Sequence, residues 1–255
     1  TANTMATALA FLGIASMDGT DLPALHPGKP EAAREAGRAV MDLLRRDLRP
    51  RQIMTREAFE NAIAAVMVTG GSTNAVLHLL AIAREVGVRL SLEDFDRISR
   101  STPVLADMKP GGRFAAPDMT LAGGLRLVAQ RLKQQERLHD GDTVSGQRMH
   151  AEADAAAERE GQQVLRTWDQ PIKAEGGIAI LRGTLAPDGC VVKLVGHDRR
   201  RHVGPARVFD SEPALFDAVA AGRIQPGDVI VIRHVGPVGA PGMPEMLKVT
   251  AALMG

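Results

Sequence analysis

Apolar residues recur every three or four positions through the first two-thirds of the chain, which is the pattern of amphipathic helices. Local signals mark where these helices start and stop. Pro30 suits a first helical turn, Thr55 an N-cap and Gly87 a C-terminal stop, while Ser91 and Asp94 form the pattern of a capping box. We therefore predict helices over 2–12, 30–49, 55–68, 74–86, 91–98 and 118–134.

The pattern changes after Gln163, where short β-type runs alternate with turn residues. Strands are predicted over 178–181, 190–195, 206–209 and 228–232, with one helix over 212–221. Val229–Ile232 is uniformly apolar, so we expect both faces of that strand to be covered. The change in pattern predicts two domains, 1–168 and 169–255.

Composition narrows the class of protein. The chain has 255 residues, of which 45% are hydrophobic and 24% charged, so a folded globular protein is expected and disorder is excluded. A net charge of +1 and an aromatic content of 3% argue against nucleic-acid binding. No apolar run is long enough to span a membrane. The single cysteine, Cys190, excludes an internal disulfide or a two-thiolate metal site, and it predicts a cytoplasmic location.

The loop Gly70–Asn74 is a candidate binding site. Two glycines allow close backbone approach, and Ser72, Thr73 and Asn74 are all N-cap residues. The N-terminus of the following helix presents N–H groups and a positive dipole end, which suit a carboxylate or phosphate. Gly71, Ser72, Thr73 and Asn74 are therefore predicted substrate-binding residues. A helix–turn–helix cap with no ligand explains the same residues equally well.

A second candidate is Glu245, in the Gly/Pro-rich loop that follows the 228–232 strand. Hard cations such as Mg²⁺ prefer carboxylate oxygens, so Glu245 is a predicted magnesium ligand. Its alternative role is to interact with the dipole of the next helix. The seven histidines show no metal-binding spacing, and Cys190 is interpreted as a buried, unreactive thiol.

Seven motifs occur in one order along the chain, and together they resemble the dihydroxy-acid dehydratase family, which includes 6-phosphogluconate and sugar-acid dehydratases. The motifs span residues 1–5, 70–74, 105–112, 171–177, 204–209, 227–233 and 241–246. The resemblance implies an α/β N-terminal domain with helices around a sheet, here incomplete. It also implies a C-terminal β-barrel-like domain similar to the swivel domain of aconitase, here truncated.

The resemblance implies removal of water from a 2,3-dihydroxy acid to give a 2-keto acid, with an iron–sulfur cluster (2Fe-2S or 4Fe-4S) and Mg²⁺. It assigns Glu245 to the family's magnesium-binding glutamate. Cys190 matches no cluster cysteine, and the segment after Thr1 matches the region just past the last one. The family's serine base is expected beyond Gly255. We therefore expect an internal fragment that lacks both ends and is inactive by itself.

The ending 241–247 is closer to the enzyme of branched-chain amino-acid biosynthesis than to the sugar-acid members. A sugar-acid or 6-phosphogluconate dehydratase is the alternative enzyme. A non-catalytic ligand-binding module is the alternative of another class. The expected partners are a small dihydroxy acid and further copies of the chain, as a homodimer or homotetramer, with neither nucleic acid nor membrane.

Overall fold

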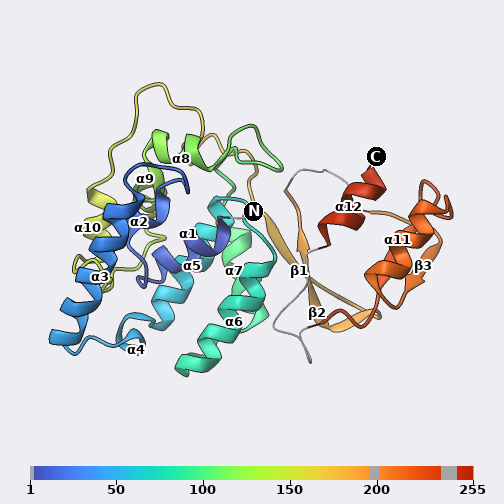
Figure 1. Cartoon of the computed structure of the whole chain (residues 1–255), viewed down its shortest axis with the longest axis horizontal. Helices are drawn as coiled ribbons and strands as arrows, with labels where there is room; N and C mark the ends of the chain where they lie inside the picture. The colour runs from blue at the N-terminus through green and yellow to red at the C-terminus, as the bar shows by residue number, and fades with distance from the viewer. Residues whose placement is uncertain (1–2, 196–200, 237–245, 255) are drawn as a thin grey trace. The chain divides into compact units, whose positions relative to one another are not determined.

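The computed structural model describes residues 3–195, 201–236 and 246–254. The chain divides into two compact units, residues 1–197 and 198–255. Figure 1 shows the order of their helices and strands along the chain. The first unit is mainly helical and ends in a β-hairpin, while the second alternates strands and helices.

Ten helices and two strands make up the described part of the first unit. They are α1 (Thr4–Phe11), α2 (Met17–Asp21), α3 (Lys29–Arg45), α4 (Pro50–Ile53), α5 (Arg56–Val68), α6 (Asn74–Val86), α7 (Leu92–Ser101), α8 (Ala116–Ala122), α9 (Gly124–Lys133), α10 (Met149–Asp154), β1 (Ile178–Gly183) and β2 (Ala186–Lys193). Helix α5 forms the centre of the core: Phe59, Ile63 and Met67 are fully buried, and α1, α7 and α9 pack around the helix. Burial of this apolar surface is the main source of stability for the unit.

The predicted helix ends are largely confirmed. The Thr55 side chain accepts a hydrogen bond from the backbone N–H of Ala58 at 3.3 Å. Ser91 and Asp94 form a reciprocal capping box at the start of α7. Gly87 ends α6 in the left-handed region with φ 81°. These ends depend on neighbouring residues alone, which is why the sequence predicts them well.

The prediction of one helix over 118–134 is wrong. The chain breaks at Gly123 into α8 and α9, and both Gly123 and Gly124 have positive φ, 135° and 66°. A side chain at Gly124 would collide with the Asp21 carboxylate, so a residue distant in sequence packs closely against this break. The helix predicted over 30–49 likewise ends earlier, at Arg45.

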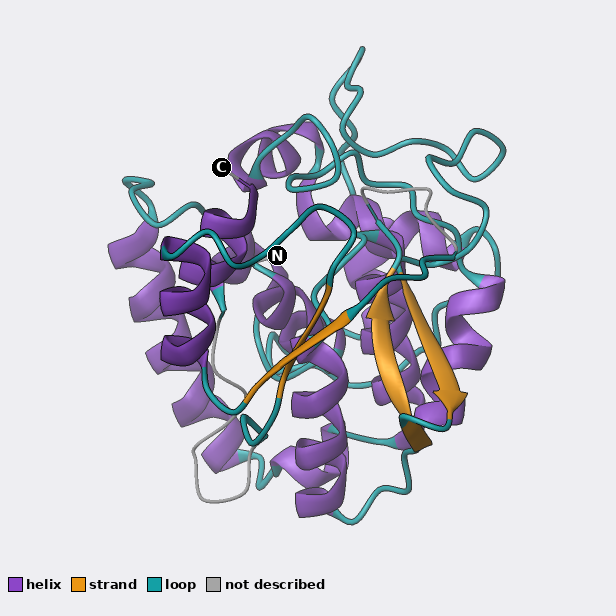
Figure 2. Cartoon of the chain, turned by 90° about the vertical axis from the view of Figure 1, so that its right-hand side faces the viewer, coloured by secondary structure: helices purple, strands orange, loops and turns teal. Residues whose placement is uncertain are grey.

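Strands β1 and β2 form an antiparallel hairpin in which Ile178 pairs with Lys193 and Leu181 with Cys190. Ile178 and Ile180 are buried on the face toward the helices, and α7 packs against β1. Figure 2 shows helices as the dominant element and the strands as separate pairs. The described residues therefore confirm the α/β class of the first domain in its general form.

The second unit contains β3 (Ala206–Phe209), α11 (Glu212–Ala220), β4 (Val229–Ile232) and α12 (Leu247–Met254). Strands β3 and β4 are parallel, with Ala206 opposite Val229 and Phe209 opposite Ile232. All four residues of β4 are only half-buried, so the expectation that both faces are covered is not met among the described residues. The described strands form two two-stranded sheets and no closed barrel.

The predicted domain boundary at 168/169 remains a prediction. The β-hairpin that follows that boundary groups with the first compact unit. Within the three described ranges, no helix combines the length and the apolar character needed to cross a bilayer.

Candidate functional site

Three of the sequence motifs come together in the first unit. The backbone N–H groups of Leu105 and Ala106 both donate to the carbonyl of Val68, at the end of α5. On the other side, Val104 donates to the carbonyl of Lys173 at 3.0 Å. The segment 103–106 thus lies between the loop that follows α5 and the segment 171–177. Residues more than 60 positions apart form one continuous backbone network.

The loop 70–74 is held tightly at its start. Gly70 has φ 64°, and the N–H of Gly71 donates to the carbonyl of Val66 at 2.9 Å. A Cβ at Gly71 would lie 2.8 Å from both Thr4 Cγ2 and Val66 Cγ1, so the position has no room for a side chain. The Ser72 N–H donates to the hydroxyl oxygen of Thr4 at 3.1 Å, and both residues are buried. The loop is therefore fastened to the first turn of α1.

The N-terminus of α6 has fewer available donors than its sequence predicts. The N–H of Asn74 donates to the Ser72 side chain at 3.3 Å, and those of Ala75 and Val76 donate to backbone carbonyls of the loop at 3.1 Å. Hydrogen bonds within the chain thus occupy amides that the anion-site argument needs. Thr73 and Asn74 are half-buried, whereas Gly71 and Ser72 are buried. A substrate-binding role for Gly71, Ser72, Thr73 and Asn74 stays a prediction.

Gly176 and Gly177 allow the third motif to pack against this loop. A Cβ at Gly177 would lie 3.0 Å from the Cα of Gly70 and would overlap the Val195 side chain. The N–H of Gly176 donates to the carbonyl of Ser99 at 2.8 Å, and the Ser99 hydroxyl donates to the carbonyl of Ile178. Ser99 on α7 therefore fixes the point at which β1 begins.

Two lysines that are not among the predicted site residues, Lys173 and Lys193, add positive charge to this region. The Lys173 ammonium donates to the carbonyl of Leu194 at 3.1 Å. Lys193 is half-buried at the end of β2, and removal from water lowers the pKa of its ammonium group. The occurrence of a lysine inside the apolar run 191–195 is the sequence signal from which Lys193 could have been predicted.

Asp107 in the second motif has a structural role. Burial alone raises the pKa of this carboxyl group, but hydrogen bonds from the side chain and backbone of Arg113 hold the pKa below its usual value. The Arg113 Nε and backbone N–H donate at 2.6 and 3.0 Å to the Asp107 carboxylate. Asp107 thus closes the loop 107–113, and its oxygens are already occupied.

The predicted magnesium ligand, Glu245, lies outside the described residues. Among the residues that are described, no group of three or more His, Cys, Asp or Glu side chains has the arrangement of a metal site. Cys190 is half-buried in β2, opposite Leu181. The described residues therefore do not supply a complete ligand set for an iron–sulfur cluster or for Mg²⁺.

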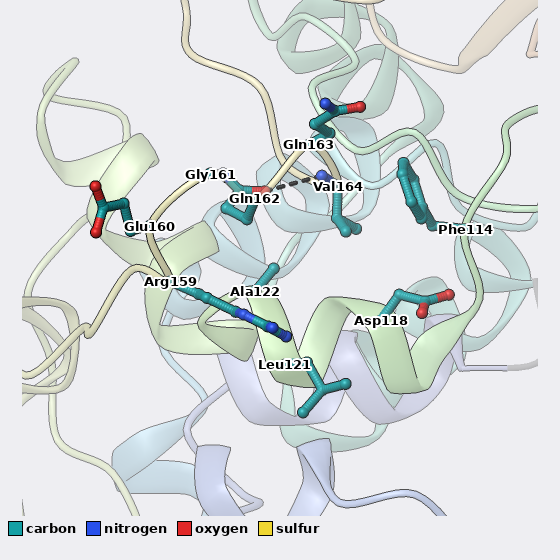
Figure 3. Close-up of a pocket in the computed structure, with 10 residues that line it drawn as sticks. All are labelled: Phe114, Asp118, Leu121, Ala122, Arg159, Glu160, Gly161, Gln162, Gln163 and Val164. Carbon is teal, nitrogen blue, oxygen red and sulfur yellow. Dashed lines mark hydrogen bonds between the residues drawn. The ribbon is translucent and has the colours of Figure 1, made fainter.

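A separate concavity lies between α8 and the loop 159–164 (Figure 3), with a volume of about 330 Å³. Its rim carries Arg159 and Asp118, and its wall includes Leu121. The Gln162 side chain shapes the loop by accepting the N–H of Val164 at 2.8 Å. None of the predicted site residues lines this concavity, and Asp118 already accepts the N–H of Ala115.

Comparison with known families gives two consecutive matches. Residues 1–153 match the N-terminal model of the dihydroxy-acid/6-phosphogluconate dehydratases, and residues 163–255 match the C-terminal model. Proteins named dihydroxy-acid dehydratase are similar over the whole chain: 53% identity in Roseiflexus castenholzii, 55% in Koribacter versatilis and 51% in Thermus thermophilus. The chain spans 46%, 45% and 46% of the length of these relatives, respectively.

Proposed function

The chain belongs to the dihydroxy-acid/6-phosphogluconate dehydratase family, and we propose from this that the whole protein is a hydro-lyase acting on a 2,3-dihydroxy carboxylic acid. The observation that carries the proposal is the match of both family models, in order, over nearly the whole chain. The relatives are named dihydroxy-acid dehydratase, which supports a dihydroxy acid as substrate. The resemblance of residues 241–247 favours a branched-chain dihydroxy acid, and thus a role in isoleucine and valine biosynthesis, over a sugar acid or 6-phosphogluconate.

The proposed reaction removes the C2 proton and the C3 hydroxyl group of the substrate, which leave together as water. The resulting enol then tautomerises to the 2-keto acid. The family resemblance implies that an iron–sulfur cluster and Mg²⁺ supply Lewis-acid chemistry in such enzymes. Because the described residues do not form a complete site for either group, we assign no step of the reaction to a metal here.

The convergence of three motifs supports a structural role for this chain in the proposed site. The Thr4–Ser72 hydrogen bond joins the start of α1 to the loop 70–74. The resemblance places the start of α1 directly after a cluster cysteine, so this bond would link the cluster-bearing segment to the predicted substrate loop. Glu245 is the proposed magnesium ligand.

Further features of the proposal follow the resemblance alone. The region from 169 onward would form part of a barrel-like domain similar to the aconitase swivel domain. The protein would be cytoplasmic and would assemble as a homodimer or homotetramer.

The test is an assay of the protein encoded by the complete open reading frame. A branched-chain 2,3-dihydroxy acid, an aldonic acid and 6-phosphogluconate are compared as substrates, and keto-acid product is measured as its phenylhydrazone. We expect turnover of the branched-chain acid to exceed that of the others by at least 10-fold. Preferred turnover of a sugar acid supports the alternative enzyme, and ligand binding without turnover of any of them supports a non-catalytic module.

A second measurement tests Glu245. We expect Glu245→Gln in the complete protein to weaken Mg²⁺ binding, measured by titration calorimetry, because a neutral amide replaces a charged oxygen ligand. Glu212→Gln, at a half-buried position in the first turn of α11 in the same half of the chain, is the matched control. Equal Mg²⁺ affinity in the two variants and the parent protein contradicts the assignment.

A further inference from the structure

Three aspartates of the chain are followed directly by glycine: Asp18, Asp140 and Asp188. An aspartate in this position can isomerise without an enzyme, because glycine has no side chain to shield its backbone nitrogen from the preceding carboxyl group. The reaction requires that nitrogen to reach the carboxyl carbon, so the folded structure decides which of the three aspartates reacts. The local structure differs at each of them.

Asp18 is held in a helix. It lies in α2, where its side chain points toward the N-terminal end and therefore away from the nitrogen of the next residue. The N–H of Gly19 donates to the Ser16 hydroxyl at 3.1 Å. The Asp18 carboxylate accepts a hydrogen bond from Arg126 Nη1 at 2.6 Å. Both groups that would react are therefore engaged with other residues.

Asp140 has both carboxylate oxygens occupied. One accepts the backbone N–H of His150 at 3.0 Å, and the other accepts Arg148 Nε at 2.8 Å. Burial alone raises the pKa of this carboxyl group, but the two hydrogen bonds hold the pKa below its usual value. Attack by the glycine nitrogen needs a neutral carboxyl group that is free to rotate. The hydrogen bonds of Asp140 oppose both requirements.

Asp188 lies in a bulge of the β1–β2 hairpin and lacks these restraints. Leu181 pairs with Cys190 and Gly183 with Ala186, so residues 187–189 of β2 lie opposite a single residue of β1. Such a bulge interrupts the ladder of backbone hydrogen bonds. Asp188 is exposed, and among the residues that the structure describes its carboxylate makes no hydrogen bond or ion pair. Gly189 has φ 109°, a conformation that other residues rarely adopt.

We propose that Asp188–Gly189 is a site of spontaneous isomerisation, at which aspartate is converted to isoaspartate. The Gly189 nitrogen forms a bond to Cγ of Asp188, and the hydroxyl group of the carboxyl leaves with the amide proton as water. The resulting five-membered succinimide ring then takes up one water. Opening of the ring at the original backbone carbonyl leaves the chain connected through Cβ and Cγ of Asp188. No atom is gained or lost overall.

The hairpin has room for the product. Isoaspartate adds one carbon to the main chain between Ala186 and Cys190, both of which are paired across the hairpin. The added carbon lies where the ladder is already interrupted, so neither pair has to break. This inference uses only the first unit and does not depend on the proposed dehydratase activity.

Peptide mapping tests the proposal. The complete protein is incubated at neutral pH for several weeks and digested with trypsin, which releases Asp188 in the peptide 183–193 and Asp140 in the peptide 138–148. Isoaspartate is identified by electron-transfer fragmentation, and the succinimide by the loss of one water. We expect isoaspartate to accumulate at Asp188 at least 10-fold faster than at Asp18 or Asp140. Its absence at Asp188, or equal rates at the three positions, would overturn the proposal.

Unfolding of the protein separates the effect of the structure from that of the sequence. In guanidinium chloride all three aspartates lose their folded surroundings, and we expect their rates of isomerisation to agree within about threefold. A 10-fold lead of Asp188 that persists in the unfolded chain would assign the reaction to its sequence neighbours and contradict the role of the bulge.

A single variant tests the role of the restraints. Arg148→Ala frees one carboxylate oxygen of Asp140, and we expect it to raise the rate at Asp140 at least threefold while the rate at Asp188 stays the same. An unchanged rate at Asp140 would show that these hydrogen bonds do not protect it, and the reasoning that selects Asp188 would fail.

Discussion

The carboxyl group of Asp21 lies at the junction of α2 and α9. It accepts a hydrogen bond from the backbone of Leu125, in the first turn of α9, and it occupies the space in which Gly124 has no side chain. Burial raises the pKa of Asp21 from 3.8 to about 6, with a further rise from the nearby Asp18 carboxylate. The hydrogen bonds and Lys29 oppose this shift but do not cancel it.

The raised pKa fixes the sign of a pH effect on stability. The folded chain binds a proton at Asp21 more tightly than the unfolded chain does, so the free energy of unfolding falls as the pH rises from about 4 to about 6. A shift from 3.8 to about 6 corresponds to about 3 kcal/mol. Above about pH 6 the carboxyl group is charged in both the folded and the unfolded chain, and its burial lowers the free energy of unfolding by an amount that no longer changes with pH.

We expect Asp21→Asn to remove this destabilisation by the buried carboxylate. Asparagine keeps an oxygen acceptor for Leu125 and is neutral at every pH, so the variant should be about 2–3 kcal/mol more stable than the parent at pH 8. The difference should shrink to near zero at pH 4, where both side chains are neutral. Urea denaturation at pH 4, 6 and 8 measures it.

A control variant separates the effect of Asp21 on stability from that of the other carboxyl groups. Asp42→Asn, on the exposed helix α3, is the control and should change stability by less than about 0.5 kcal/mol at each pH. Equal stability of Asp21→Asn and the parent protein at pH 8 would refute the reasoning. So would a difference between them that does not change with pH.

Three further predictions concern single residues of the first unit, and each is given as the loss in free energy of unfolding. Asp94→Ala should lower this free energy by about 1–3 kcal/mol in urea denaturation, because it removes both the α7 capping box and the ion pair with Arg56. Burial raises the pKa of Asp94, but the Arg56 and Ser91 hydrogen bonds lower it to about 2. The stabilisation by Asp94 should therefore be present above about pH 4 and be lost as the pH falls toward 2. A stabilisation that is instead absent at pH 8 would contradict this reasoning. Gly71→Ala should cost about 1–3 kcal/mol through overpacking against Thr4, whereas Gly87→Ala, with open space around it, should cost about 1 kcal/mol from its positive φ alone. Phe59→Ala should cost about 3–5 kcal/mol by opening a cavity beside α5, and a cost below 1 kcal/mol would show that the core collapses around it.

Local signals predicted the helix ends, whereas contacts between distant residues were not predicted. Thr55, Gly87 and the Ser91–Asp94 pair act within four residues, so the sequence alone reveals them. The break at Gly123 was missed because the helical periodicity continues on both sides of it, although the Gly123–Gly124 pair is a local signal for a break. Nothing in the sequence indicated that the Asp21 carboxylate, about a hundred residues away, would pack against Gly124.

The candidate site shows the same limit. The residue types in the loop 70–74 predicted a tight turn and a helix start, and both are present. The sequence did not predict that Thr4 would take the Ser72 N–H, or that amides of the α6 start would be satisfied within the chain. Hydrogen bonds between residues 68 positions apart depend on how the helices pack, and no local pattern encodes them.

The backbone bridges around Val104 affect how this protein can be recombined with its relatives. Residues 164–173 belong to the C-terminal family match, yet Val164, Arg166 and Lys173 form backbone hydrogen bonds to the segment 104–107 of the N-terminal match. A chimera joined between the two matches, at 154–162, would replace one side of each bridge and keep the other. A junction within 196–200 keeps both sides of each of these bridges from the same parent protein. This segment is therefore the better crossover point for exchanging halves.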